Sequence, residues 1–423
     1  MNTPFLLPCG VELPNRICKP AMSEQLAYRS GCPTPQIIHL YERWGKEGGA
    51  GLLITGNIMV HPYRLTEPRN CILIDDRFLS EFSQMAKVAK ANGSKVIAQI
   101  SHPGRVATMP MLTPPVGPSS IPLDIPILKF RKPRALEISE IEEIIQSFAR
   151  TAELCMRAGF DGVQIHAAHG YLVSQFLSPK SNTRNDAYGG DAERRRKLIL
   201  DIVKETRMKI GANAILSVKL NSADMQKGGF TEEESLGVIP LLEKAGVDLL
   251  EISGGNYESP SMVGTIKPSS QKREAYFLEF ASKVRNISNI PLMLTGGIRT
   301  PEFGNQVIES KEVDILGIAR PFAIAADAGT RLLRGQPLTD LATLRKTGIP
   351  LIDAFLQISF SQLCLIELSE GKKVEGKEYS AVVVLIRVVL GLNVKVLTQY
   401  PENDWKWISI IGIIFILVFR RIF

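Results

Sequence analysis

Short apolar runs alternate with longer amphipathic stretches along most of the chain. An apolar run of about four to eight residues is typical of a buried strand, and apolar residues at every third or fourth position predict a helix. We expect a helix over 137–159, which Ser139 and Glu142 would open as a capping box. The expected strands are 16–21, 51–60, 95–101, 162–168, 215–221, 249–255, 291–297 and 315–321.

Strands that alternate with helices over about 320 residues favour an α/β fold in which eight strands close into a (β/α)8 TIM barrel. The alternative is an open, doubly wound Rossmann-like sheet. Such a sheet carries GxGxxG after a strand when it binds a dinucleotide, and this motif follows none of the expected strands. The barrel is therefore the favoured architecture.

The composition is that of a globular protein. The chain has 423 residues, of which 45% are hydrophobic and 22% are charged, so it can bury a large core or form two domains. Its formal charge of +7 comes from dispersed basic residues without a base-stacking motif. This charge suits an anionic cofactor or an acidic substrate, and we expect no nucleic-acid partner.

The cysteines and the N-terminus indicate the compartment. The six cysteines show neither CxxC nor zinc-finger spacing, so free thiols in a reducing compartment are expected rather than a metal site or an iron–sulfur cluster. The N-terminal MNTPFLLPCG lacks a basic region and a long apolar run. We therefore expect no signal peptide, and a barrel domain in the cytoplasm.

The strand expected at 162–168 ends in polar groups that have no place in a core. His166, His169 and Tyr171 come together at its carboxyl end, beside Gly170. Two imidazoles and a phenol can hold an oxygen and deliver a proton. A lone buried histidine is usually structural, but three such groups at the end of one barrel strand favour an active site. The His-x-x-His pair lacks a third ligand nearby in sequence, so no metal is expected.

The loops after the seventh and eighth expected strands suit a phosphate group. Gly296, Gly297 and Gly317 let backbone N–H groups approach a ligand, and Arg320 adds a forked donor. Barrels often bind phosphate at these two loops. The sequence therefore predicts a phosphate site made of these four residues.

The run HAAHGYLVSQFLSP, followed by NTRNDAYGG and AERRRKL, resembles the Old Yellow Enzyme family of FMN-dependent oxidoreductases, also called the NADH:flavin oxidoreductase/NADH oxidase family. The resemblance extends over about the first 370 residues. It implies bound FMN, NADH or NADPH as the reductant and a small-molecule substrate, and it leaves the oligomeric state open. It also includes NRICKPAMSE, QISHPGR, VKLNSAD, LEISGGNYE, LTGGIR and LGIARP.

The resemblance further implies which residues contact the flavin. Gln99 matches the position that hydrogen-bonds the flavin pyrimidine, and Lys219 matches a position where many relatives carry Arg near flavin N1 and O2. Ser23 matches a Cys or Thr near flavin O4 in better known branches, although a serine cannot act as a redox-active thiol. The remaining implied contacts are Pro20, Ala21, Met22 and Gly56, the last of which leaves room for the ring.

By the same resemblance, the reaction is the reduction of an alkene conjugated to a carbonyl or nitro group. Reduced nicotinamide would transfer hydride to the flavin, and flavin N5 would pass it to the β-carbon. His166 and His169 would bind the substrate oxygen, and Tyr171 would protonate the α-carbon from the opposite face. The alternatives are an NADH oxidase, a demethylating dehydrogenase of the same family, and a non-catalytic membrane-anchored flavoprotein.

Two segments depart from a plain barrel. The proline-rich segment 103–135 is expected to form a lid over the barrel mouth. We expect 1–375 to form the barrel domain and 376–423 a tail. The uncharged run 407–419 begins at the second of two tryptophans and is followed by two arginines, but it is shorter than the roughly 20 residues that span a bilayer. A membrane-associated tail, a buried or interfacial helix and an aberrant gene model all stay open.

Overall fold

Eight parallel strands close into a ring in the part of the chain that the computed structural model describes. Neighbouring strands follow the order β3, β4, β7, β12, β13, β14, β15 and β16. β16 pairs with β3 and β7 pairs with β12, so the ring has no free edge. This closure confirms the predicted (β/α)8 barrel and excludes the open Rossmann-like sheet. The described residues are 1–107, 114–125, 128–129, 131–256, 258, 270–296, 298–338, 341–345, 350–380 and 384.

The barrel strands are buried and rich in aliphatic residues, as parallel strands covered on the outside by helices must be. They are β3 (Ile17–Lys19), β4 (Leu52–Ile54), β7 (Lys95–Ser101), β12 (Gly162–Ala167), β13 (Ile215–Asn221), β14 (Leu249–Ser253), β15 (Leu292–Thr295) and β16 (Ile315–Gly317). The short strands outside the ring are β1 (Phe5–Leu6), β2 (Glu12–Leu13), β5 (Ile58–Met59), β6 (Cys71–Ile72), β8 (Val116–Gly117), β9 (Asp124–Ile125), β10 (Leu128–Lys129), β11 (Arg134–Ala135), β17 (Thr343–Leu344) and β18 (Glu378–Tyr379).

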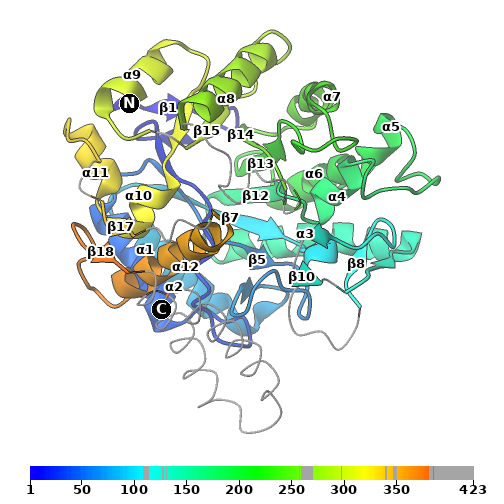
Figure 1. The fold of residues 1–423 in the computed structure, drawn as a ribbon, viewed down its shortest axis with the longest axis horizontal. Coiled ribbons are helices and arrows are strands. Elements are labelled where there is room, and N and C mark those ends of the chain that lie inside the picture. Colours follow the sequence, from blue (N-terminus) through cyan, green and yellow to red (C-terminus); the bar gives the residue numbers. More distant parts are fainter. Residues whose placement is uncertain are drawn as a thin grey trace, which may run out of the picture.

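Helices surround the ring, and Figure 1 shows α12, in orange, beside the blue α1. Arg43 of α1 donates to the carbonyl of Leu368 in α12 at 3.3 Å, which joins the first helix to the last. The helices are α1 (Pro35–Glu47), α2 (Leu79–Ala89), α3 (Ile138–Arg157), α4 (Leu172–Leu177), α5 (Ala192–Arg195), α6 (Lys197–Ile210), α7 (Glu232–Lys244), α8 (Ser270–Arg285), α9 (Pro301–Glu309), α10 (Ala319–Ile324), α11 (Ala328–Leu333) and α12 (Pro350–Ser369), with 3₁₀ turns η1 (Asp76–Phe78) and η2 (Gly104–Val106).

The two ends of the barrel differ in polarity. At the amino-terminal end, Leu7 and Leu13 of the β1–β2 hairpin pack with Leu52, Ile97 and other residues near the starts of the strands in one buried apolar cluster. At the carboxyl end, five of the eight strands finish in polar residues, which are Lys19, Ser101, Asn221, Ser253 and Thr295. Because this apolar cluster closes the amino-terminal end, we expect the catalytic residues at the carboxyl end.

Three local predictions were wrong. The expected strand 315–321 ends at Gly317, and helix α10 begins at Ala319. The expected strand 51–60 is divided into β4 and β5, because the N–H of Gly56 donates to the Glu24 carboxylate at 2.9 Å instead of to a strand. The expected capping box of Ser139 and Glu142 lies inside α3. The carboxylate of Glu140 instead accepts from the N–H of Glu137 at 2.8 Å, so the helix is capped two residues earlier.

The proline-rich segment 103–135 contributes η2 and the short strands β8 to β11 in its described part, with β8 paired to β11 and β9 to β10. The run 407–419 lies outside the described residues, so the membrane-associated tail stays a prediction. Among the residues that are described, no helix combines the length and the apolar character that crossing a bilayer requires.

Candidate active site

The loop after β12 turns sharply and carries three polar rings. His166 is the penultimate residue of β12, and Tyr171 directly precedes α4. Between them, His169 and Gly170 have φ angles of 60° and 74°, in the left-handed region. Glycine adopts this conformation without strain, whereas histidine seldom does. His169 is held there partly by its N–H, which donates to Asn221 Oδ1 at 3.3 Å.

The three rings pack edge to face around His166. The His166 ring centroid lies 5.2 Å from that of His169 and 4.6 Å from that of Tyr171, with interplanar angles of 80° and 83°. His166 and Tyr171 are buried. These separations are those of favourable aromatic edge contacts. The structure therefore brings together all three residues that the sequence singled out, and contacts within the protein fix their relative positions.

Burial keeps both histidines neutral. It lowers the pKa of His166 well below its ordinary value and lowers the pKa of His169 to about 3, with Lys219 adding a smaller contribution to each. A neutral imidazole has one N–H donor and one acceptor nitrogen. The Nδ1 of His166 accepts from the N–H of Ala168 at 3.3 Å, so its proton lies on Nε2. The Nε2 of His169 lies 2.6 Å from Ser253 Oγ.

Residues of the predicted lid cover Tyr171. Its ring packs with Val106 and Leu123 in a small buried cluster. Arg105 forms an ion pair with Glu258 at 2.6 Å, and both side chains are buried. The same guanidinium donates to the carbonyls of Ile121 and Pro122, at 3.3 and 3.2 Å. These contacts hold the described part of the segment over the Tyr171 phenol, and the segment shields the phenol from water.

A chain of buried polar side chains crosses the interior of the barrel. Gln99 of β7 donates to Gln164 of β12 at 2.7 Å, and Gln164 donates to the carboxylate of Glu251 in β14 at 3.0 Å. Glu251 also pairs with the ammonium of Lys219 at 2.8 Å and accepts from Thr295 Oγ1 at 2.8 Å. The structure thereby connects two residues assigned to the flavin by resemblance, Gln99 and Lys219.

Our sequence reasoning missed Gln164 and Glu251. Both are fully buried. A signal was available, because each is a polar residue flanked on both sides by apolar residues in a buried strand, in GVQIHA and in LLEIS. A buried charge in such a strand requires a partner of opposite charge, and Lys219 faces Glu251 in the register of β13 and β14.

The segment Pro20–Ser23 follows β3 and crosses the end of β4. A Cβ atom on Gly56 would lie 2.4 Å from the carbonyl oxygen of Met22 and 2.0 Å from a Glu24 carboxylate oxygen. Close packing alone thus requires glycine at this position, whatever room it leaves for a ligand. Ser23 Oγ donates to the carboxylate of Glu67, whose pKa burial raises. Glu67 is another contact that the sequence did not reveal.

Lys19 joins this segment to the end of β4. Its buried ammonium donates to the carbonyls of Ile54 at 2.7 Å and Pro20 at 3.1 Å, and it lies 4.5 Å from the centroid of the Trp44 ring. Burial lowers the pKa of Lys19 to about 8. A cation that binds carbonyls from two neighbouring strand ends holds those ends together.

The predicted phosphate loops are more open. Gly296 has a φ of 123° and open space where a Cβ would stand, and its N–H donates to the carbonyl of Gly317 at 3.0 Å. A Cβ on Gly317 would lie 2.2 Å from Thr295 Oγ1, so this glycine serves packing inside the barrel. Arg320, near the start of α10, is exposed. Gly297 lies outside the described residues.

These residues fit a flavin mononucleotide. Lys219 provides a fixed cation at the end of β13, and Gln99 provides an amide whose orientation is set by Gln164. The open side of Gly296 and the exposed guanidinium of Arg320 suit a phosphate. The donor set therefore combines polar partners for a ring system with a cationic partner for an anion.

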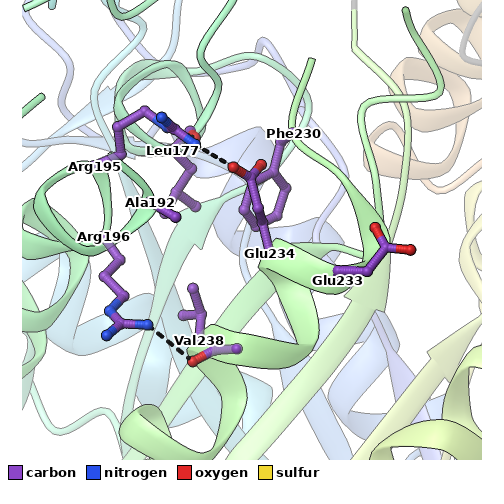
Figure 2. A pocket seen from close by; sticks show the side chains of 9 residues that line it. Leu177, Ala192, Arg195, Arg196, Phe230, Glu233, Glu234 and Val238 are labelled. Atoms are coloured by element: carbon purple, nitrogen blue, oxygen red, sulfur yellow. Dashed lines mark hydrogen bonds and ion pairs between the residues drawn. The ribbon is translucent and has the colours of Figure 1, made fainter. Parts of the chain in front are cut away.

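Two cavities lie away from the residues that the sequence assigned to the site. Figure 2 shows one of about 250 Å³ between α5 and α7. Arg195 forms an ion pair with Glu234 there and donates to the carbonyl of Leu177 at 3.0 Å, so its charge serves the fold. A second cavity, of about 520 Å³, is lined by residues of 118–120 and 183–186. Neither is lined by the ring triad or by Lys219.

Known proteins resemble this chain over most of its length. The sequence pattern of the NADH:flavin oxidoreductase / NADH oxidase family matches residues 3–338. NADH-dependent flavin oxidoreductase iliE of Hypocrea jecorina is 39% identical over 349 residues, which cover 76% of this chain and 86% of that protein. NADH oxidase of Thermoanaerobacter brockii is 35% identical over 310 residues, covering 72% and 46%.

A solved structure has the same fold. The Old Yellow Enzyme homologue from Zymomonas mobilis superposes with a TM-score of 0.67 at 24% identity, covering 80% of this chain and 94% of that one. The family pattern, the relatives and the donor set agree on FMN as the cofactor, with NAD(P)H as the reductant. The chain belongs to the NADH:flavin oxidoreductase / NADH oxidase family.

Proposed function

We propose that this oxidoreductase saturates alkenes activated by a carbonyl or nitro group. The observation that carries the proposal is the ring triad at the barrel mouth, in which two neutral imidazoles and a phenol pack against one another. Neutral imidazoles donate hydrogen bonds to an oxygen, and a phenol supplies a proton. An activated alkene needs a hydrogen-bond donor at its oxygen and a proton at its α-carbon.

The histidines bind and polarise the substrate. His166 donates its Nε2–H to the substrate oxygen. We assign Ser253 Oγ as the donor to Nε2 of His169, 2.6 Å away, and this assignment leaves the Nδ1–H of His169 as the second donor to the substrate. Two donors on one oxygen stabilise the negative charge that develops there and make the β-carbon electrophilic. Bound FMN supplies the hydride for that carbon.

Tyr171 completes the reaction by giving its phenolic proton to the α-carbon. Packing against His166, Val106 and Leu123 fixes the phenol and limits the access of water. The flavin would be held by Gln99, Lys219 and Arg320, by the loops of Gly296, Gly297 and Gly317, and by the segment Pro20, Ala21, Met22 and Ser23 beside Gly56. These assignments rest on the family resemblance and on the donor set described above.

A substrate screen tests this function. Cyclohexenone, maleimide and a nitroalkene should each accelerate anaerobic oxidation of NADH or NADPH by the purified holoprotein, with the saturated product detected by mass spectrometry. The likeness to an NADH oxidase favours a second candidate, in which oxygen is the electron acceptor. Oxidation of nicotinamide in air without turnover of any alkene would select that candidate.

We also propose that a barrel domain of residues 1–375 is cytoplasmic and that the tail 376–423 tethers it to a membrane. Tyr379, past this boundary, is buried and donates to Glu367 of α12 at 2.6 Å. A chain ending after Val384 should therefore keep FMN and activity, while a chain ending after Lys373 should be less stable. Only the full-length protein should sediment with membranes, and equal partition of all three chains would reject the tether.

A further inference from the structure

The ammonium of Lys219 and the carboxylate of Glu251 form an ion pair inside the barrel. Their side chains are 8% and 0% exposed, and the two groups are 2.8 Å apart. Lys219 also lies opposite His166 in the register of β12 and β13, so the pair lies beside the strand end that carries the ring triad. At such burial neither charge is screened by water, and the carboxylate cancels much of the field of the cation.

This cancellation matters for any group that becomes more negative during turnover. Reduction places additional negative charge on a flavin, and a lone buried cation beside it would favour the reduced form. Because the Glu251 carboxylate is paired with the Lys219 ammonium, the net charge of the two groups is close to zero. The carboxylate therefore opposes the effect of the lysine.

We propose that Glu251 is a positioning residue that holds Lys219 against the flavin and lowers the reduction potential of the bound FMN. The inference rests on the proposed placement of the flavin beside Lys219. A lower reduction potential favours hydride transfer from the reduced flavin to the alkene. The Glu251 carboxylate therefore makes the bound flavin a stronger hydride donor than it would be beside Lys219 alone.

The carboxylate also sets the orientation of Gln99. An ionised carboxylate only accepts hydrogen bonds, so Gln164 must present its NH₂ group to Glu251 and its carbonyl oxygen to Gln99. Gln99 must then present its NH₂ group to Gln164. A single buried charge thus fixes both the cation and the amide that we assign to the flavin.

The test is the potential of FMN bound to the full-length holoprotein, measured anaerobically against a reference dye. In Glu251→Gln the equilibrium constant for flavin reduction should rise at least tenfold, which is 29.6 mV for a two-electron couple. Thr295→Val is the matched control, because it removes a hydrogen bond from the same carboxylate without removing the charge. Its equilibrium constant should change less than threefold.

An unchanged or lower potential in Glu251→Gln would overturn the proposal, as would an equal rise in both variants. If Glu251→Gln does not retain FMN, the double variant Lys219→Met with Glu251→Gln replaces it. If the two charges cancel, removing both in the double variant should leave the equilibrium constant for flavin reduction within threefold of wild type. A tenfold decrease would contradict the proposal, because it would mean that Glu251 does not offset the charge of Lys219. Loss of FMN from both variants would also count against the proposal. No alkene is present, so the result is independent of the ene-reductase assay.

Discussion

The mouth of this barrel has two sides that are organised differently. On one side, the His166–Tyr171 loop is fixed by ring packing, by hydrogen bonds between His169 and the side chains of Asn221 and Ser253, and by the cover of Val106 and Leu123. On the other, Gly296 adjoins open space and Arg320 is exposed. Contacts within the protein fix the first side, whereas the second leaves open space beside Gly296 that we expect the phosphate of the cofactor to occupy.

This difference assigns separate effects to the two sides. Substitutions in the ring triad should change substrate binding and proton transfer while FMN stays bound. Substitutions in the phosphate loops should change the retention of FMN and leave the chemistry of the bound fraction intact. The experiments below test this separation.

The largest effect is expected for Tyr171→Phe. Reduction of the flavin by nicotinamide needs no proton from the phenol, so that half-reaction should stay nearly unchanged. Saturation of a poorly activated enone should slow by roughly 10²–10⁴-fold, the usual range for a lost general acid. Stopped-flow measurement of each half-reaction decides the matter.

Nitroalkenes provide the internal control for Tyr171→Phe. A nitronate product is stable enough to leave and be protonated by water, so these substrates should be slowed less than enones. If both half-reactions slow equally, or if enones are unaffected, then Tyr171 is a packing residue and not the proton donor.

The next effect concerns the histidines. A phenol-type ligand should bind over the flavin and produce a long-wavelength charge-transfer band. His166→Ala combined with His169→Gly, which tolerates the positive φ at 169, should weaken this binding by at least about 10²-fold, because two hydrogen bonds to a charged oxygen are lost. Tyr171→Phe should retain the band, and a double variant that also retains it would refute the assignment.

A smaller effect is expected on the phosphate side. Arg320→Ala should weaken FMN binding by about 10- to 100-fold, since a charge-assisted hydrogen bond contributes roughly 1.5–3 kcal/mol. Arg334→Ala, an exposed arginine at the end of α11, is the control and should retain FMN. Flavin content after gel filtration gives the answer, and identical retention in both variants would place the phosphate elsewhere.

The smallest effect is a pH dependence of stability. Folded His169 has a pKa of about 3, whereas an unfolded histidine takes up a proton below about pH 6.5. Between these values the unfolded state binds more protons, so the free energy of unfolding falls as the pH falls. At pH 5.5 the loss from this group should be about 1.4 kcal/mol.

Urea unfolding at pH 7.5 and 5.5 measures this loss. His169→Asn is the matched variant, because asparagine tolerates a positive φ and does not titrate. It should lose correspondingly less stability on acidification than the wild type. The same loss in both proteins would show that His169 is not held in the neutral form.

Several features were determined by the sequence alone. Alternating apolar and amphipathic segments specified the barrel. A strand buried on both faces is a short continuous apolar run, whereas a helix buried on one face has apolar residues at every third or fourth position. β7 and β13 begin and end where the sequence predicted. The triad was also readable, since polar side chains at the end of an apolar strand have no structural reason to be there. These are properties of local pattern.

Tertiary structure decided which polar residues meet. Gln99, Gln164, Glu251 and Lys219 belong to four strands, and the pairing of these strands in the sheet brings them into one buried chain. The role of Gly56 was likewise hidden, because the Glu24 carboxylate that it packs against lies 32 residues away in sequence. Hydrogen bonds and burial depend on distances across the fold, and the period of one segment carries no information about them. For this reason the sequence identified the residues at the mouth, while the structure showed what holds them.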